Sequence, residues 1–373
     1  MTGEEPVFAL RRAGFSDLPG WGDDDPSALV PAMLRCLGHA RAVKPYRTGS
    51  LGLTTADIVP AYEAAASLPQ SGAADVRIFF EQQFQPFLIR RRDQEPGFVT
   101  GFYEPEVEVS DRRSGPWQFP FYRRPDDLVE LDDGNRPAGM DPACQFGRIE
   151  AGRIGPYPDR RAIDEGILEN RGLEIAWARS KADVFFAHVQ GAARLRFRDG
   201  SLRRITYAAK AGYPFTAIGR LLIDRGEIDA ASVSMQAIRA WLAANPEKVD
   251  EVLWHNRSYI FFREAAVEDL ALGPIAAAKV PLLPGRSLAV DRLIHTFGFP
   301  FFIHAPGLKH LDRGGPFART MLALDTGSAI VGPARGDIFT GSGDEAGELA
   351  GTIRHEADFY ILIPRAAAER YDE

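Results

Sequence analysis

The sequence contains little cysteine and no long apolar run. Only two of its 373 residues are cysteine, Cys36 and Cys144, and they lie far apart without a spacing typical of metal sites. We therefore expect two buried or unpaired thiols rather than a disulfide framework or a cysteine-ligated zinc. No uninterrupted apolar run approaches the roughly 18 residues that a membrane-spanning helix needs, which excludes an integral helical membrane protein.

Several familiar functional signatures are also missing. The formal net charge of −7 argues against a nucleic-acid partner, because binding to phosphates requires an excess of positive charge. The seven histidines form neither an HxH nor an HExxH pair, and no phosphate-binding loop or serine-nucleophile motif occurs. We expect no metal and no organic cofactor. The N-terminal residues 1–6 show no basic segment followed by an apolar one, so no signal peptide is expected in this chain.

The residues that are present indicate a folded chain with helices first and strands later. Hydrophobic residues make up 45% of the sequence, and 36 glycines and 27 prolines are scattered as in β-rich folds. Apolar spacing predicts a helix capped by Ser27, a helix over residues 55–68 and a third whose apolar stripe covers residues 76–88. Strand-forming residues begin near Gly97, and the turn Asp199-Gly200 predicts a hairpin over residues 195–205.

The middle and end of the chain alternate between both kinds of element. Residues 216–225 and 232–244 have helical character, and residues 258–262 are typical of a buried strand. From Gly273 onward, short strands separated by Gly and Pro favour a barrel or a sandwich.

Three aspartates end or interrupt apolar strands in the C-terminal part of the chain. They are Asp291, Asp325 and Asp337, and glycines follow the last two. Neighbouring carboxylates raise each other's pKa, and a carboxyl that stays protonated near neutral pH can act as a general acid. An Asp beside Gly is also the ordinary composition of a turn, so the residues alone leave a catalytic and a structural interpretation open.

An aromatic group presents a similar choice. Tyr103, Trp117, Phe121 and Tyr122 could form a wall on which sugars stack, or they could pack across neighbouring strands. Their spacing does not distinguish the two interpretations.

Three segments in this order resemble the membrane-bound lytic transglycosylase A family, whose members degrade murein. They are FVTGFYEP at 98–105 with FPFYR at 119–123, NRSYIFF at 256–262, and LDTGSAI at 324–330 continuing through DIFTGSG at 337–343. The last segment, together with Asp291, resembles the 3D domain, named for its three aspartates. The chain departs from the family pattern at Arg257, where Pro is common, at Ser328, where Gly is common, and at Phe102 and Phe339, where Tyr is frequent.

The resemblance implies a mainly β fold with N-terminal helices. Residues 1–104 and 269–373 are expected to form a double-psi β-barrel domain that includes the helical N-terminal part and the 3D segment. Residues 105–268 are expected to form a smaller inserted β-rich domain, which would provide the other wall of a glycan groove.

The resemblance also implies an activity. The expected reaction is cleavage of the β-1,4 bond between N-acetylmuramic acid and N-acetylglucosamine with formation of a 1,6-anhydromuramoyl end. Asp337 is expected to act first as acid and then as base, and Asp325 and Asp291 are expected to support it by raising its pKa or by holding its loop. The expected substrate-binding residues are Thr100, Gly101, Phe102, Tyr103, Ser328, Gly341, Ser342 and Gly343.

The sequence leaves three other functions open. One is a murein hydrolase in which Asp325 activates a water beside Asp337, and another is a non-catalytic peptidoglycan-binding module. The third, suggested by the missing signal peptide, is a cytoplasmic protein of unrelated function. For the peptidoglycan functions we expect a monomer that binds glycan strands in the periplasm, with outer-membrane association in a longer precursor.

Overall fold

The computed structural model describes residues 8–68, 72–93, 95–266, 269–312 and 314–371. The N-terminal residues 1–6, from which no signal peptide was expected, lie outside the described residues. Within the described ranges, no helix combines the length and the apolarity that crossing a membrane requires.

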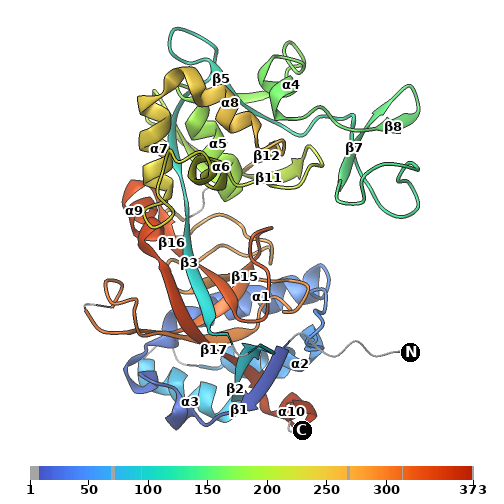
Figure 1. The fold of residues 1–373 in the computed structure, drawn as a ribbon. Helices are drawn as coiled ribbons and strands as arrows, with labels where there is room; N and C mark the ends of the chain where they lie inside the picture. Colours follow the sequence, from blue (N-terminus) through green and yellow to red (C-terminus); the bar gives the residue numbers. More distant parts are fainter. Residues whose placement is uncertain (1–7, 69–71, 94, 267–268, 313, 372–373) are drawn as a thin grey trace. The chain divides into compact units, whose positions relative to one another are not determined.

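The chain divides into two compact units (Figure 1). The first contains Met1–Tyr103, Ala271–Gly341 and Leu349–Glu373, and the second contains Glu104–Leu270 and Ser342–Glu348. The chain therefore leaves the first unit within a strand at Tyr103 and returns to it at Ala271. The domain boundary predicted at residue 268 falls on residues 267–268, which lie outside the described ranges.

The first unit is built on an eight-stranded sheet in the order β1-β2-β17-β14-β15-β13-β16-β3. An additional pairing of β17 with β3 closes the last six of these strands into a ring. The strands are β1 Phe8–Arg12, β2 Phe84–Arg91, β3 Gly97–Glu104, β13 Ser287–Val290, β14 Pro300–Ala305, β15 Phe317–Asp325, β16 Arg335–Ser342 and β17 Arg354–Pro364.

Strand β13 sets the register of the part of the barrel that carries the aspartates. It runs parallel to β15 on one side and antiparallel to β16 on the other. Its Ala289 is paired with Asp325 of β15 and with Asp337 of β16. Because residues in register across neighbouring strands share a level of the sheet, the two aspartates lie at one level with a single strand between them.

Helices of the N-terminal part pack around this barrel. They are α1 Val30–Ala42, α2 Thr55–Ala65 and α3 Ala73–Gln83, and α10 Arg365–Ala368 follows near the C-terminus. Helix α9 Asp344–Thr352 is divided between the two units, with Glu348 in the second and Leu349 in the first. Short 3-10 turns occur at η1 Phe15–Asp17, η2 Trp21–Asp23, η3 Pro26–Leu29 and η5 Glu369–Tyr371. Side chains from α1, α2, α3 and α10 and from the barrel strands form one continuous hydrophobic core.

Two details of the predicted helices are wrong. The first has no cap at Ser27: Asp25 caps the 3-10 turn η3 that leads into α1, and its carboxylate accepts a hydrogen bond from the Ser27 N–H. The third helix ends at Gln83, and the stripe continues as strand β2. Pro86 lies in that strand, and a proline in a helix interior would remove a hydrogen bond and clash with the preceding turn.

The second unit contains a six-stranded and a three-stranded sheet. The first has the order β12-β11-β10-β4-β9-β5 and includes the predicted hairpin, whose strands are β10 and β11. The strands are β4 Glu106–Ser110, β5 Phe119–Tyr122, β9 Glu174–Ala178, β10 Ala192–Phe197, β11 Leu202–Lys210 and β12 Ile260–Ala265, with β6 Leu128–Glu130, β7 Phe146–Glu150 and β8 Arg153–Gly155 in the small sheet.

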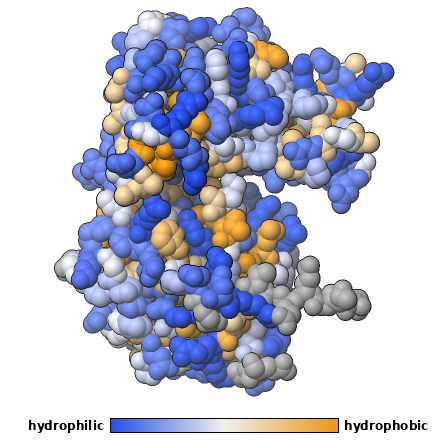
Figure 2. Space-filling view, in the orientation of Figure 1, coloured by the Kyte–Doolittle hydropathy of each residue, from blue (hydrophilic) through white to orange (hydrophobic). Residues whose placement is uncertain are grey.

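Within the described residues of this unit, five helices and one 3-10 turn accompany these sheets. They are α4 Arg160–Asp164, α5 Lys181–Gln190, α6 Ile218–Asp224, α7 Met235–Ala244, α8 Val249–Trp254 and η4 Pro246–Lys248. The expectation of a β-rich chain with N-terminal helices is confirmed, although helices also occur in the middle of the chain. On the face shown in Figure 2, hydrophilic residues dominate, and apolar residues form small separate groups.

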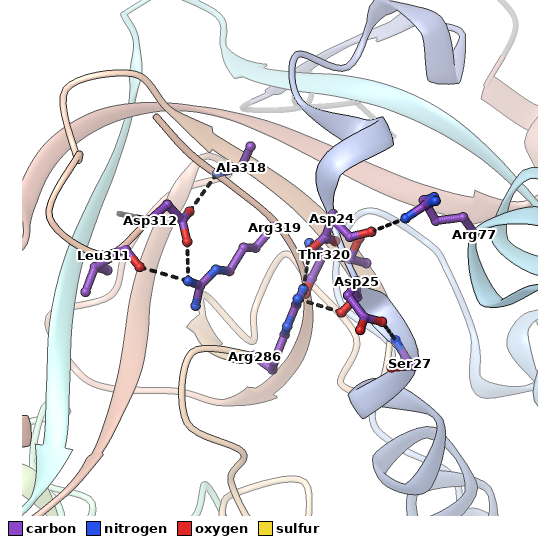
Figure 3. A network of polar contacts seen from close by, with 10 residues as sticks. All are labelled: Asp24, Asp25, Ser27, Arg77, Arg286, Leu311, Asp312, Ala318, Arg319 and Thr320. Carbon is purple, nitrogen blue, oxygen red and sulfur yellow. Dashed lines mark hydrogen bonds and ion pairs between the residues drawn. The ribbon is translucent and has the colours of Figure 1, made fainter. Parts of the chain in front are cut away.

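A buried ion pair fastens the N-terminal segment of the first unit to its barrel (Figure 3). The guanidinium of Arg286 lies 2.7 Å from the carboxylate of Asp24, whose side chain is only 1% exposed. The same carboxylate accepts the Thr320 N–H of β15 at 2.8 Å, and Arg286 also donates to the Thr320 carbonyl at 2.9 Å. Both carboxylate oxygens of Asp24 and the guanidinium of Arg286 therefore have partners, which is the condition under which a buried ion pair is tolerated.

We expect Asp24→Asn to lower the free energy of unfolding by about 3 kcal/mol, because it leaves the Arg286 charge without its carboxylate in a buried place. Urea-induced unfolding measures the change. Asp312→Asn is a matched control, since Asp312 pairs with Arg319 in the same region but about a quarter of each side chain is exposed. The control is expected to cost about 1 kcal/mol or less. Equal losses in the two variants would contradict this account.

Candidate active site

Asp337 lies in the middle of β16, between the buried residues Gly336 and Ile338. Its residue is half-buried, and its Oδ1 accepts a hydrogen bond from the hydroxyl of Thr100 at 2.5 Å. Thr100 belongs to β3, which is the neighbour of β16 in the ring. The contact therefore joins two residues 237 positions apart in the sequence.

Arg335 completes a chain of three polar side chains. Its Nη2 lies 2.7 Å from the Thr100 Oγ1, and its Nη1 donates to the Gly336 carbonyl. The guanidinium also lies over the ring of Phe98, at 5.8 Å from the ring centroid. Arg335 and Asp337 are two residues apart on one strand, so they point to the same face of the sheet.

Asp325 ends β15 at the level of Asp337. Its Oδ1 accepts the backbone N–H of Ala277 at 3.1 Å. Ala277 belongs to a tight turn in which Lys279 has a positive φ of 63°, a conformation that non-glycine residues seldom adopt. Tyr46, which lies far from this turn in the sequence, stabilises it, because its hydroxyl donates to the Ala278 carbonyl at 2.8 Å.

Burial raises the pKa of both carboxyl groups. For Asp337, the Thr100 hydrogen bond and the charge of Arg335 act in the opposite direction. The pKa of Asp325 is raised to about 6. Burial is the largest cause and the charge of Asp337 adds to it, whereas hydrogen bonds from the Ala277 and Thr326 backbones act in the opposite direction. Withdrawal from water, rather than the neighbouring carboxylate, is thus the main cause of the raised pKa of Asp337.

Asp291 has a different environment. It is buried, and its two carboxylate oxygens accept the backbone N–H groups of Leu293 and Gly332, both at 2.9 Å. Gly332 lies in the loop that leads into β16, so Asp291 ties the end of β13 to the start of the strand that carries Asp337. The structure therefore brings Asp325 and Asp337 to one level of the sheet. Asp291 instead binds the backbone of the loop after β13 and of the loop before β16.

The segment after Thr100 is packed rather than open. A Cβ on Gly101 would lie 2.8 Å from the Cα and the carbonyl oxygen of Ala350, so only glycine fits this position. The ring of Phe102 packs against Phe339 of β16 with centroids 5.2 Å apart, and Tyr103 is buried.

The remaining predicted substrate-binding residues fall in different places. Ser328 is exposed in the loop after β15, and Gly341 is buried with a φ of 132°. Ser342 and Gly343 belong to the second unit, where the Ser342 hydroxyl and the Gly343 N–H donate to Glu104 at 2.7 and 2.9 Å.

Two charged groups were not predicted from the sequence. One is Arg335, which could have been found from its i, i+2 position before Asp337. The other is Glu104, a fully buried carboxylate in the second unit that Arg204 contacts at 2.6 Å and Arg194 at 2.9 Å. The GFYEP segment contained Glu104, but no local pattern indicated its arginine partners, which are about 90 and 100 residues away. In the part of the chain that the structure describes, no group of three or more His, Cys, Asp and Glu residues could hold a metal ion.

Two family models match the regions that this geometry emphasises. The model described as "MltA specific insert domain" matches residues 98–263, and the model described as "3D domain" matches residues 286–363. The chain is thus a barrel protein with a 3D segment and an insert of this type. It belongs to the membrane-bound lytic murein transglycosylase A family.

Solved structures and a curated relative agree with this assignment. A membrane-bound lytic murein transglycosylase from Agrobacterium tumefaciens is 64% identical, with a TM-score of 0.92 over 97% of this chain and 99% of that chain. Escherichia coli MltA with bound chitohexaose is 26% identical, with a TM-score of 0.67 over 98% of this chain and 93% of that one. The membrane-bound lytic murein transglycosylase A of Escherichia coli K12 is 34% identical over 270 residues, which are 70% of this chain and 64% of the relative. This chain therefore matches somewhat less than two thirds of that curated relative's length.

The raised pKa of Asp325 predicts a pH-dependent stability. The folded protein binds this proton more tightly than the unfolded chain, so the stabilisation is complete below the unfolded pKa of about 4 and is lost as the pH rises through about 6. Asp325→Asn cannot lose a proton there. We expect its melting temperature, relative to that of the original protein, to be higher at pH 8 than at pH 4.5. Thermal melting at both pH values measures this, and an equal difference at the two would contradict the assignment.

We expect Asp291→Ala to destabilise the first unit by about 1 to 3 kcal/mol, because two backbone N–H groups lose a charged acceptor. Asp291→Asn keeps one acceptor oxygen and is expected to cost less. Urea-induced unfolding compares the two variants with the original protein. An alanine variant of unchanged stability would show that water replaces the carboxylate without loss.

Proposed function

We propose that this protein is a lytic transglycosylase that cleaves the β-1,4 bond between N-acetylmuramic acid and N-acetylglucosamine in peptidoglycan. The observation that carries the proposal is the environment of Asp337, a half-buried carboxyl with a raised pKa whose Oδ1 bonds Thr100. Such a carboxyl can hold a proton near neutral pH and release it to a leaving oxygen. Membership of the family supports the choice of substrate.

One carboxyl group is sufficient for this reaction. Protonated Asp337 gives its proton to the glycosidic oxygen as the bond from that oxygen to C1 of muramic acid breaks. The resulting carboxylate then takes the proton from the C6 hydroxyl as its oxygen attacks C1, which forms the 1,6-anhydro ring and restores the acid. Because the nucleophile belongs to the same sugar, its effective concentration is very high and no water has to be positioned.

Asp325 is assigned a supporting role. Its carboxylate is held by the backbone N–H groups of Ala277 and Thr326, so it is less free to activate a water. Its charge interaction with Asp337 nevertheless keeps a two-carboxylate hydrolase as a second candidate, since ordinary glycosidases use such pairs. Asp291 is assigned the task of holding the loop before β16.

The substrate-contact residues are proposed by analogy with the family. The Escherichia coli relative was solved with bound chitohexaose, a β-1,4-linked chain with the acetamido groups that peptidoglycan also carries. The proposed contacts in the first unit are Thr100, whose hydroxyl bonds Asp337, with Gly101, Phe102, Tyr103, Ser328 and Gly341. Those in the second unit are Ser342 and Gly343.

We also infer the architecture and location that go with this function. The closed ring of six strands supports a double-psi barrel, and the match over residues 98–263 supports an inserted domain near 105–268. A protein that cleaves peptidoglycan acts where that polymer lies, so we propose a periplasmic location and action as a monomer.

The test is mass spectrometry of the soluble products released from purified peptidoglycan. We expect muropeptides that are lighter by one water than hydrolysis products and that lack a reducing end. Asp337→Asn is expected to lower the rate by at least about 100-fold while the variant still binds peptidoglycan, because Asn cannot transfer the proton.

Asp358→Asn is the matched control, since Asp358 forms a partly exposed ion pair with Arg90 in the same barrel. Its activity is expected to be unchanged. Products with reducing ends would favour the hydrolase. Binding without any product would favour a non-catalytic module, and an active Asp337→Asn variant would refute the role of Asp337.

A further inference from the structure

The Thr100 hydroxyl lies between a cation and the proposed acid. Its Oγ1 is 2.7 Å from the Arg335 Nη2 and 2.5 Å from the Asp337 Oδ1. The three side chains come from two strands, β3 and β16, of one unit.

The chemistry of the three groups fixes the direction of both hydrogen bonds. A guanidinium only donates, so Arg335 must occupy a lone pair of the Thr100 oxygen. A hydroxyl has a single proton, and the contact that remains for it is the Asp337 Oδ1. Oδ1 is therefore an acceptor whether the carboxyl group is protonated or not.

We infer that Arg335 is a positioning residue that, acting through Thr100, keeps the transferable proton of Asp337 on Oδ2. This inference rests on the proposed function and adds the oxygen from which the proton leaves. The proton passes from Oδ2 to the glycosidic oxygen as the C1–O bond breaks, and Oδ2 later accepts the proton of the C6 hydroxyl. Throughout, the Thr100 O–H remains on Oδ1, where it stabilises the carboxylate present between the two transfers.

Arg335 is itself fixed in place. It donates to the carbonyl of Gly336, and its guanidinium rests over Phe98, which precedes Thr100 by two residues on β3. Other charges act on the site from other elements, namely Asp325 at the end of β15 and Lys279 in the turn that holds Asp325. Among the described residues, neither of them forms a hydrogen bond with the Thr100 hydroxyl, so the hydroxyl takes its orientation from Arg335.

The test compares Arg335→Met, Thr100→Val and Thr100→Ser in the full chain, with release of anhydromuropeptides from peptidoglycan as the assay. Thr100→Val keeps the shape of the side chain and removes the hydroxyl, and we expect its kcat at acidic pH to fall about 10- to 100-fold with little change in KM. Arg335→Met is expected to lower kcat in the same way. Thr100→Ser keeps the hydroxyl and is expected to remain within about threefold of the original protein.

The pH profile and the double variant separate a relay from a merely structural role. Loss of either partner removes an interaction that favours the Asp337 carboxylate, so the alkaline fall in kcat/KM is expected to move to higher pH in both single variants. Because Arg335 acts through Thr100, adding Arg335→Met to Thr100→Val is expected to change kcat at acidic pH by no more than about twofold. Arg90→Met, which removes a partly exposed arginine from the same barrel, is the control and is expected to leave kcat and the profile unchanged.

The outcomes also distinguish this inference from the proposed function. No anhydro product from the original protein, or an active Asp337→Asn variant, would refute the proposed function. If those results are as expected but Thr100→Val keeps the original kcat and pH profile, the relay alone is refuted. Multiplicative losses in the double variant would refute action of Arg335 through Thr100. Should Arg335→Met fail to fold, the Thr100→Val and Thr100→Ser pair still decides the matter.

Discussion

Closure of the barrel by β3 is the constraint on which the candidate site depends. This strand pairs with β17, where Thr100 is in register with Arg354, and it also neighbours β16. This double pairing brings the Thr100 hydroxyl within hydrogen-bonding distance of the Asp337 carboxylate. A shift of one residue along either strand would turn Thr100 to the opposite face of the sheet, because side chains alternate along a strand.

The barrel also sets a balance of electrostatic effects around Asp337. Asp337 lies between the buried residues Gly336 and Ile338 of β16. The withdrawal of its carboxyl group from water favours the neutral acid. The Thr100 hydroxyl and the Arg335 charge favour the carboxylate. An acid that must lose its proton and regain it in one reaction benefits from both, because a large preference for either form would slow one of the two transfers.

Local sequence patterns predicted the helices and the hairpin, which form through contacts between residues close together in the sequence. The hairpin over residues 195–205 was found from its Asp-Gly turn. The helices predicted over residues 55–68 and 232–244 are present as the shorter α2 and α7. Strand β2 was mistaken for helix because its apolar residues Phe84 and Leu88 continue the spacing of α3. It forms because β1 and β17 supply hydrogen-bond partners on both edges, and those partners are distant in sequence.

The candidate site also combines residues that local patterns indicated with contacts that depend on distant strands. Asp325 and Asp337 stood out because each interrupts an apolar strand near glycine. Their register on either side of Ala289 depends on the parallel pairing of β13 with β15, which no local pattern contains. The contact of Arg335 with Thr100 spans 235 residues, so it too required the fold.

The excursion of the chain between Tyr103 and Ala271 has a consequence for biosynthesis. Strand β3 leaves the ribosome long before β16, because Thr100 of β3 and Asp337 of β16 are 237 residues apart in the sequence. At elongation rates of about 5 to 20 residues per second, this interval lasts roughly 10 to 50 s. Most of the second unit emerges during that time and is free to fold. Strands β2 and β3 meanwhile lack the hydrogen-bond partners that β17 later provides. Those two strands are the part of the nascent chain most exposed to mispairing, and the last strand made, β17, relieves both of them at once.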